Sequence, residues 1–233
     1  MRTLIIIPVL LFSLFFGVSS YSADFNKGLT AAQSGDFATA LKEWKPLAEE
    51  GDALAQYYLG VMYENGDGVT QDDKEAVYWW RLAAEQGIAL AQYNLGLMYY
   101  RGDGVPQDYK EAVYWYKLAA EQGIAQAQYN LGLIYDNGKG VPQDYKEAAR
   151  LYRLAAEQGL ADAQFNLGVM YVVGEGVPLD KVYAYMWFNI LAANGDKEAE
   201  EKRNKLNKTL SQSQVQEAQR LTRECVKKNY KGC

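Results

Sequence analysis

Apolar and polar positions along residues 53–196 follow a pattern that recurs every 36 residues without a gap. Each unit begins with a nearly continuous apolar segment, passes through a glycine-rich turn, and continues with alanine and aromatic residues at helical spacing. A fixed period of this length is typical of helical hairpins that stack, because one hairpin cannot bury both of its faces alone. The sequence therefore predicts an all-α fold, a right-handed superhelical solenoid of stacked helix–turn–helix repeats.

The second unit illustrates the expected boundaries. Its first helix is expected over residues 89–100 and ends at Gly102, because glycine enters positive φ at little cost. The segment GDGVPQD forms the turn, and Asp108 caps the second helix, with Glu111 placed three residues later as in a capping box. Gly123 then ends that helix. The neighbouring units repeat the cap with Asp72 and Glu75, and with Asp144 and Glu147.

One glycine lies inside the first helix of every unit. These glycines are Gly60, Gly96, Gly132 and Gly168. Each costs about 1 kcal/mol relative to alanine, so a compensating contact is expected. We expect the backbone of the second helix to approach closely at alanine pairs such as Ala83-Ala84, while the tyrosines and tryptophans fill the space between hairpins.

The four units resemble a known repeat family. They resemble one pattern, A-x-A-Q-Y-N-L-G-x-x-Y-x-x-G-x-G-V-P-x-D-x-x-x-A-x-x-W-x-x-x-A-A-x-x-G. This pattern resembles the Sel-one-like repeat, a short tetratricopeptide-like class with a longer turn between its helices. The resemblance covers residues 53–196 and implies a scaffold for protein interactions.

The segments on either side of the repeats are predicted to be caps. Residues 23–52 resemble a shorter starting hairpin, whose turn is Ser34–Asp36 and whose second helix should bend or break at Pro46. Residues 197–233 resemble closing helices. Ser211 and Gln214 are spaced as a capping box, and Val215, Ala218, Leu221 and Cys225 lie on one side of the helix that follows.

Residues 1–22 have the layout of a secretory signal peptide. A basic residue, Arg2, precedes the apolar run 4–18, and small residues follow at positions 19, 20, 22 and 23. We expect cleavage near residues 20–23. An uncleaved anchor is the alternative. The run is short for a membrane span, which needs about 20 residues, and no later segment is as long and apolar. We therefore expect a periplasmic or secreted protein without a transmembrane segment after cleavage.

The charge distribution argues against a nucleic-acid partner. Beyond Arg2, the only charged residue of 1–22, the chain carries 23 basic and 29 acidic side chains, a net charge of −6. Residues 197–233 hold ten basic and five acidic side chains, so the remainder carries −11. An acidic body is unsuited to binding phosphate backbones, and a solvated terminal helix accounts for the basic tail equally well.

Known catalytic and metal-binding patterns are not found in the sequence. It contains no histidine, which removes Ser-His and Cys-His nucleophiles and the commonest metal ligand. No S-x-x-K motif occurs, and the GDG and GKG turns lack the Lys-Ser/Thr of a phosphate loop. Carboxylates near Asp67 lack the spacing of a calcium loop. We expect no catalytic residue, cofactor or metal, although exported members of the resembled family with weak β-lactamase-like activity leave that enzyme as an alternative.

Residues that recur on the first helices are the candidates for partner binding. Asparagine follows an aromatic residue in three units, and the resemblance to tetratricopeptide repeats implies that this position faces a concave groove. An asparagine side chain both donates and accepts, as peptide recognition requires. A structural bond between neighbouring hairpins explains the position equally well. The groove candidates are Asn94, Asn130, Asn166, Tyr57, Tyr93 and Tyr129, together with Tyr100 and Arg101, where otherwise similar units differ.

The aromatic residues of the second helices have two interpretations. At this repeat spacing they are more often core than a stacking platform for a ligand. The series comprises Trp79-Trp80, Trp115, Tyr116, Tyr152 and Trp187-Phe188.

The two cysteines are expected to form a disulfide. Cys225 and Cys233 are the only ones in the chain, and export places them in an oxidising compartment, where an even count favours a bridge. Asn229 and Gly232 allow the chain to reverse between them. Two free thiols or an intermolecular link are the alternatives.

These observations favour an exported interaction scaffold, adaptor or regulator. We expect a monomer that binds a peptide or partner domain in its concave groove. A cell-wall or β-lactam-interacting enzyme and a secreted host-interaction factor are the alternatives.

Overall fold

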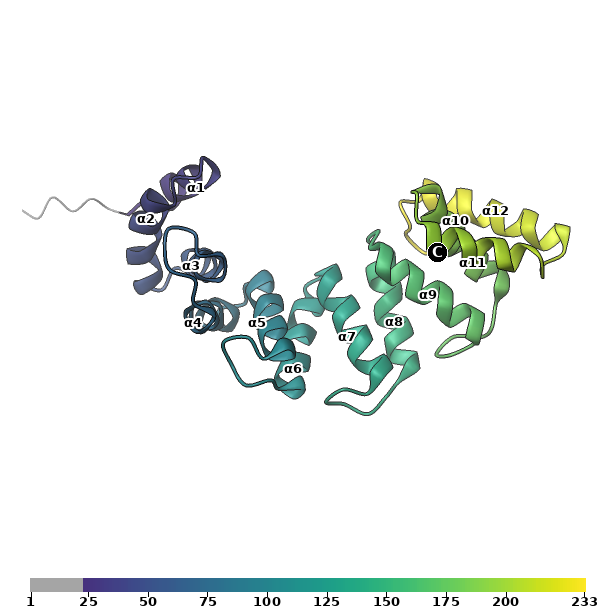
Figure 1. Cartoon of the computed structure of the whole chain (residues 1–233), viewed down its shortest axis with the longest axis horizontal. Coiled ribbons are helices and arrows are strands. Elements are labelled where there is room, and N and C mark those ends of the chain that lie inside the picture. Colours follow the sequence, from purple (N-terminus) through teal and green to yellow (C-terminus); the bar gives the residue numbers. More distant parts are fainter. Residues whose placement is uncertain (1–22) are drawn as a thin grey trace, which may run out of the picture.

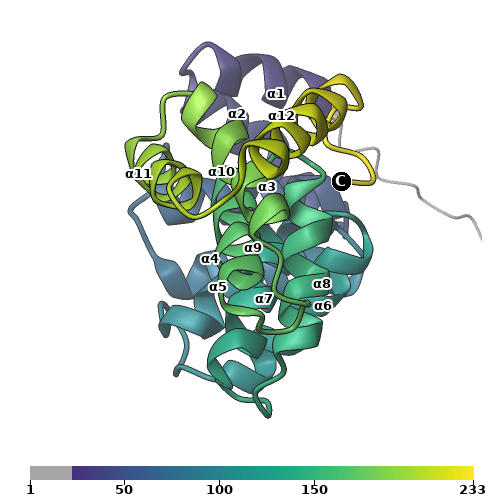
Figure 2. The ribbon, with the colours of Figure 1, turned by 90° about the vertical axis from the view of Figure 1, so that its right-hand side faces the viewer.

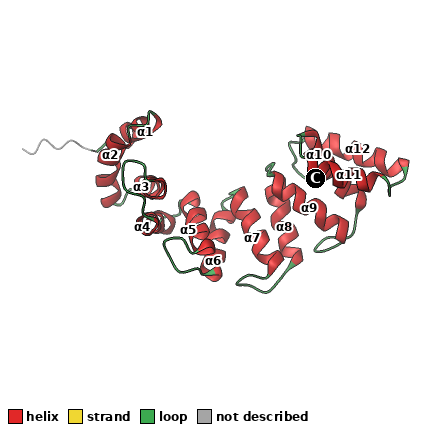
Figure 3. Cartoon of the chain, in the orientation of Figure 1, coloured by secondary structure: helices red, strands yellow, loops and turns green. Residues whose placement is uncertain are grey.

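The computed structural model describes residues 23–233, which form twelve helices and no strand. The predicted signal peptide, residues 1–22, lies outside the described residues. The helices stack into an open arc whose two ends rise on the same side (Figure 1), with loops between them (Figure 3). The predicted all-α solenoid is confirmed.

The helices come in pairs of similar length. Their bounds are α1 Phe25–Gln33, α2 Phe37–Glu49, α3 Ala53–Asn65, α4 Asp73–Glu85, α5 Ala89–Arg101, α6 Tyr109–Glu121, α7 Ala125–Asn137, α8 Tyr145–Ala156, α9 Ala161–Val173, α10 Lys181–Ala193, α11 Lys197–Asn207 and α12 Gln212–Lys227. Each helix packs on the next one along the chain from α1 to α11, and α12 packs back on α10. Seen from the C-terminal end, α10, α11 and α12 form one group (Figure 2). This group closes the stack.

The predicted helix ends are found in the structure. Gly102 adopts a left-handed conformation with φ of 85° and ends α5, while Gly123 has φ of 90° just beyond α6. The Asp108 carboxylate accepts the backbone N–H groups of Lys110 and Glu111, which caps α6. The complete reciprocal capping box among the described helices is that of α12, between Ser211 and Gln214. Local sequence therefore sets where each helix begins and ends.

The expected reason for the glycines inside the first helices is wrong in its detail. Gly60 makes room for an aromatic side chain on the second helix, because a Cβ atom built there would lie 2.4 Å from Cδ1 of Trp80. Gly96, Gly132 and Gly168 face Tyr116, Tyr152 and Phe188 in the same way. The alanine pairs are buried, but the contact that requires glycine is with the ring atoms of an aromatic side chain.

Buried glutamines connect successive repeats, a feature that the sequence analysis did not single out. Gln92 donates to the carbonyl of Ala84 at 3.1 Å and accepts a bond from Gln122 at 2.8 Å. The same arrangement joins Gln128 to Ala120 and Gln158. Each buried amide is thus bonded across the seam between two hairpins, which fixes their spacing.

The two ends differ from the repeats. Helix α2 runs through Pro46 without interruption, so the expected break does not occur. At the other end, the structure joins Cys225 to Cys233, whose Cα atoms are 5.5 Å apart. Asn229 and Tyr230 have positive φ, which reverses the chain between the two cysteines.

Candidate functional site

Tyr116 on α6 is at the centre of the candidate site. Its ring lies on Gly96, is fully buried, and packs at a tilt against the ring of Tyr93, with 5.9 Å between centroids. Asn130 on α7 of the next repeat donates its side-chain amide to the Tyr116 hydroxyl at 3.3 Å. A single side chain therefore links the two helices of its own repeat to the first helix of the next.

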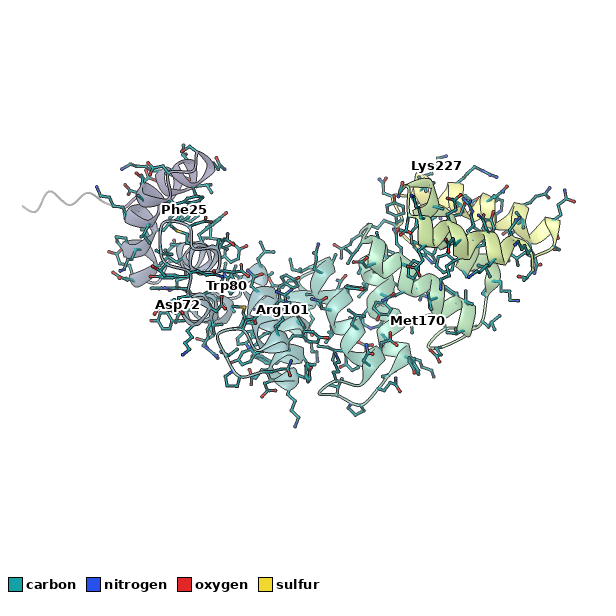
Figure 4. All side chains as sticks on the ribbon, viewed as in Figure 1. Phe25, Asp72, Trp80, Arg101, Met170 and Lys227 are labelled. Atoms are coloured by element: carbon teal, nitrogen blue, oxygen red, sulfur yellow. A yellow bond between two sulfur atoms is a disulfide. The ribbon has the colours of Figure 1, made fainter. Side chains whose placement is uncertain are left out.

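A pocket of about 250 Å³ opens at this junction, and we call it the Tyr116 pocket. Its lining residues come from α5, α6 and α7 and are Tyr93, Leu97, Tyr100, Arg101, Tyr116, Asn130 and Leu133. Figure 4 places Arg101 near the middle of the arc. Three phenol rings, two leucines, one amide and one guanidinium give the pocket an apolar wall with a few polar groups, as in many ligand sites.

The polar groups of the Tyr116 pocket differ in exposure, since Tyr116 is fully buried, Asn130 is half-buried and Arg101 is exposed. Burial raises the pKa of the Tyr116 hydroxyl, so this group stays protonated at neutral pH. The hydroxyl accepts from Asn130, and none of the described residues accepts its own proton. Arg101 is exposed, and its positive charge opposes the effect of burial on the pKa of Glu64. The pocket thus offers an O–H donor beside a cation.

Neighbouring seams carry different chemistry at the same position. Trp80 replaces Tyr116 in the first repeat and donates its indole N–H to the carbonyl of Tyr57 at 3.2 Å. In the third repeat, the Tyr152 hydroxyl donates to the Asp136 carboxylate at 3.0 Å. Phe188 of the fourth repeat has no hydroxyl. Tyr116 therefore differs from its equivalents. Its ring packs on Gly96, and its hydroxyl does not donate to a carboxylate.

The predicted groove residues separate into two groups. Tyr93, Tyr100, Arg101 and Asn130 come together in the Tyr116 pocket. Four others are half-buried on the first helices of their repeats and do not line it, namely Asn94, Asn166, Tyr57 and Tyr129. The two interpretations of the asparagine position thus meet in Asn130, which bonds across a seam and also lines a pocket.

Tyr100 has a further contact from the next repeat. The ammonium of Lys139, in the turn after α7, donates to the Tyr100 hydroxyl at 3.1 Å and lies 5.2 Å from the centre of its ring. The same ammonium lies 5.6 Å from the ring of Tyr109. Lysine stands here where the first two repeats have Asp67 and Asp103. This contact fixes Tyr100 at the rim of the pocket.

Sequence reasoning missed the role of Tyr116, which it grouped with the core aromatics. Its burial agrees with that assignment, yet the residue also lines the pocket. Tyr116 stands 20 residues after the helical glycine Gly96, at the position where the first and fourth repeats have Trp80 and Phe188. The only signal in the sequence was that Tyr116 carries a hydroxyl at this position. In the described part of the chain no group of three or more metal-ligating residues is present, and no helix within residues 23–233 has the length and apolar character to cross a membrane.

Solved structures with the same repeat resemble this chain. A Sel1 repeat protein from Oxalobacter formigenes is 36% identical and aligns with a TM-score of 0.72 over 76% of this chain and 72% of its own. A protective antigen of uropathogenic Escherichia coli, described as having an SLR fold, is 29% identical with a TM-score of 0.55 over 88% of this chain and 57% of its own.

A curated relative is similar over a shorter stretch. It is an exopolysaccharide production negative regulator from Rhizobium leguminosarum bv. viciae, 38% identical over 72 residues. That stretch is 30% of this chain and 27% of the relative. The Sel1 repeat matches residues 53–88, 89–124, 125–160 and 161–196 in succession, which is more than half of the chain. With four such repeats and the matching solenoid, the chain belongs to the Sel1 repeat family.

Proposed function

We propose that the chain is an exported adaptor or regulator that binds an extended peptide segment of a partner protein at the Tyr116 pocket. Sel1 repeat proteins are generally protein-interaction scaffolds and typically not enzymes. The observation that carries the proposal is the Tyr116 hydroxyl at this pocket, which accepts from Asn130 at 3.3 Å and donates to none of the described residues.

The chemistry of the pocket suits a peptide backbone with one apolar side chain. The Tyr116 O–H is placed to donate to a peptide carbonyl, and the Asn130 side-chain oxygen to accept a peptide N–H. Leu97, Leu133 and the ring of Tyr93 supply the apolar wall. Arg101 at the edge supplies a charge for a carboxylate, which fixes direction more than affinity.

Export is part of the proposal because of the sequence of residues 1–22 and the cysteine pair near the C-terminus. A regulatory role agrees with the similarity to the exopolysaccharide production negative regulator. Similarity to a protective antigen favours one second candidate, a secreted host-interaction factor that uses the same pocket for a host protein.

Site-specific crosslinking tests the proposed function. A photoreactive p-benzoylphenylalanine at Leu133, on the pocket wall, should capture a partner in the cell envelope fraction. The matched control carries the same group at Lys74, which is exposed on α4 and remote from the pocket. Capture from both positions equally, or from neither, would contradict binding at the Tyr116 pocket.

The compartment and the enzyme alternative need their own measurements. A partner recovered from host material rather than from the envelope would favour the host-interaction factor. Hydrolysis of nitrocefin by the purified chain would instead favour the β-lactam enzyme.

A further inference from the structure

A second hollow lies on the opposite side of α7 from the Tyr116 pocket. It measures about 400 Å³, and we call it the α6–α8 pocket because these two helices form its walls. Leu131, Tyr135, Leu151 and Leu154 line its apolar part, and Lys117 and Glu121 stand on the α6 wall. On α7, Asn130 and Leu133 face the first pocket whereas Leu131 and Tyr135 face the second. The two hollows are separate.

The α6–α8 pocket exists where one repeat lacks an indole. By the 36-residue period, Leu151 of α8 occupies the position of Trp79 on α4 and Trp115 on α6. Trp79 and Trp115 are 8% and 5% exposed and pack into the cluster of the preceding hairpin. Leu151 packs into the preceding cluster in the same way but is a smaller side chain.

The seam does not close around the smaller residue because other contacts hold the hairpins apart. Gln128 of α7 donates to the carbonyl of Ala120 on α6 at 3.1 Å across this seam. The equivalent bonds are 3.1 Å from Gln92 to Ala84 and 3.0 Å from Gln56 to Ala48. These bonds have nearly the same length in all three seams, so the hairpins keep the same distance from each other. Leucine at 151 in place of tryptophan therefore leaves an empty space and does not draw the hairpins together.

We propose that the α6–α8 pocket binds an aromatic side chain, preferably an indole, that a partner protein inserts. The inserted ring takes the place that Trp79 and Trp115 fill in the first two seams. The chain itself thus shows which group fits between two such hairpins. A pocket of this volume also has the size of ordinary ligand sites, and buried aromatic anchors are the usual centres of protein interfaces.

Charged residues at the mouth of the α6–α8 pocket indicate which residues should flank the inserted aromatic side chain in the partner. Arg150 donates two bonds to Glu147, at 2.8 and 2.6 Å, so these two residues satisfy each other. Lys117 and Glu121 form no ion pair within the described residues 23–233. A partner segment that carries a carboxylate beside its aromatic residue complements Lys117, and a basic residue on the other side complements Glu121.

The test uses N-acetyltryptophanamide, a neutral mimic of a tryptophan residue. It is titrated into the purified chain while the methyl signals of Leu131 and Leu151 are followed by NMR. We expect saturable shifts with a dissociation constant on the order of 0.1–1 mM, the range for a probe of this size. Absence of saturable shifts up to roughly ten times that range would overturn the proposal.

Two substitutions test whether the probe binds in the α6–α8 pocket. Leu151→Trp fills the pocket, so it should raise the unfolding midpoint and weaken probe binding at least about tenfold. Trp115→Leu should create a second equivalent site, seen as new shifts at Leu95 and Leu118. If that variant does not fold, Trp79→Leu serves the same purpose one seam earlier. Unchanged binding by Leu151→Trp would overturn the proposal.

Two further measurements distinguish a partner protein from a second copy of the chain and test the charged neighbour of the inserted ring. Shifts of the Leu131 and Leu151 methyls that grow with protein concentration, without probe, would assign the pocket to a second copy of the chain and overturn the partner assignment. Lys117→Gln should weaken an acetylated Trp-Asp dipeptide about threefold, the effect of one rim charge, and leave N-acetyltryptophanamide unaffected. Equal effects on both probes would overturn the assignment of the charged neighbour.

Discussion

The side-chain amide of Asn130 donates a hydrogen bond to the hydroxyl of Tyr116, with 3.3 Å between nitrogen and oxygen, across the seam between the second and third repeats. Asn94 occupies the same position one repeat earlier, but its counterpart partner is Trp80, which has no hydroxyl. One position therefore makes a bond in one seam that its equivalent does not make in the seam before. This difference provides a control within the chain.

The first prediction uses that control. Asn130→Ala should lower the free energy of unfolding by about 0.5–1.5 kcal/mol, the net value of one hydrogen bond. Asn94→Ala should change it by no more than about 0.5 kcal/mol, as for a site without a specific partner. Urea unfolding of the two variants measures the difference. A double-mutant cycle with Tyr116→Phe isolates the bond, and a coupling energy of zero would contradict it.

The same variants separate stability from binding. If Asn130 contacts a peptide at the Tyr116 pocket, Asn130→Ala should weaken the binding free energy by about 0.5–1.5 kcal/mol. This loss of binding should exceed what the lower stability of the variant explains. Crosslinking yield from position 133, measured well below the unfolding midpoint, reports this. Full capture by the variant would leave Asn130 with a structural role only.

The second prediction concerns the glycine–ring contacts. Gly60→Ala places a Cβ 2.4 Å from Trp80, whereas Gly168→Ala places it 3.0 Å from Phe188. Overpacking of this kind costs about 1–3 kcal/mol, while the better helix propensity of alanine returns about 1 kcal/mol. We expect Gly60→Ala to destabilise clearly and Gly168→Ala to be nearly neutral. Thermal unfolding followed by circular dichroism tests the order, and the reverse order would refute the explanation.

The third prediction concerns the pH dependence of the N-terminal hairpin. The carboxylate of Glu43 is buried, pairs with the ammonium of Lys27, and accepts the backbone N–H of Asp24 at 3.0 Å. The bond from Lys27, followed by that from Asp24, lowers the pKa of Glu43. Because the pKa of Glu43 is lower in the folded state, its ionisation stabilises the fold at pH values above the unfolded-state pKa of about 4.3. This stabilisation is lost as the pH falls through the folded-state pKa.

Glu43→Gln removes this linkage. Limited proteolysis within α1 should become faster for the natural chain as pH falls from about 5 to 3, whereas the variant should show weak pH dependence and be the more susceptible form at pH 6. Matching pH profiles for the two proteins would show that Glu43 does not carry the effect. Glu50→Gln, an exposed carboxylate on the same hairpin, is the control.

The fourth prediction concerns the C-terminal bridge. Thiol titration of the denatured, unreduced chain should find no reactive thiol, since Cys225 and Cys233 are bonded to each other. Cys233→Ser opens the bridge and should lower the free energy of unfolding by about 2–3 kcal/mol in the chain-entropy model for so short a loop. Two reactive thiols per natural chain would show that the bridge does not form. Non-reducing gels distinguish an intermolecular link.

Local residue chemistry allowed much of the architecture to be predicted. Helix ends depend on residues that are read one at a time, such as Asp108, which caps α6, and Gly102, which leaves α5 in a left-handed conformation. The 36-residue period then requires stacking, because every unit leaves apolar faces that only another unit covers. Pro46 is a counterexample, since packing of α2 against its neighbours keeps a helix that local rules would break.

The candidate sites were decided by contacts between residues of different repeats. Tyr116 meets Asn130 of the next hairpin, and Leu151 faces a hollow because the bond from Gln128 to Ala120 keeps the seam at the spacing of its neighbours. In the sequence, tyrosine at 116 and leucine at 151 are ordinary core residues. The sequence by itself determined the helices, their caps and the need to stack, since these follow from local preference and periodicity. Only the tertiary structure decided which hydroxyl is left with a proton to give and which seam is left open, because both depend on distances across the stack.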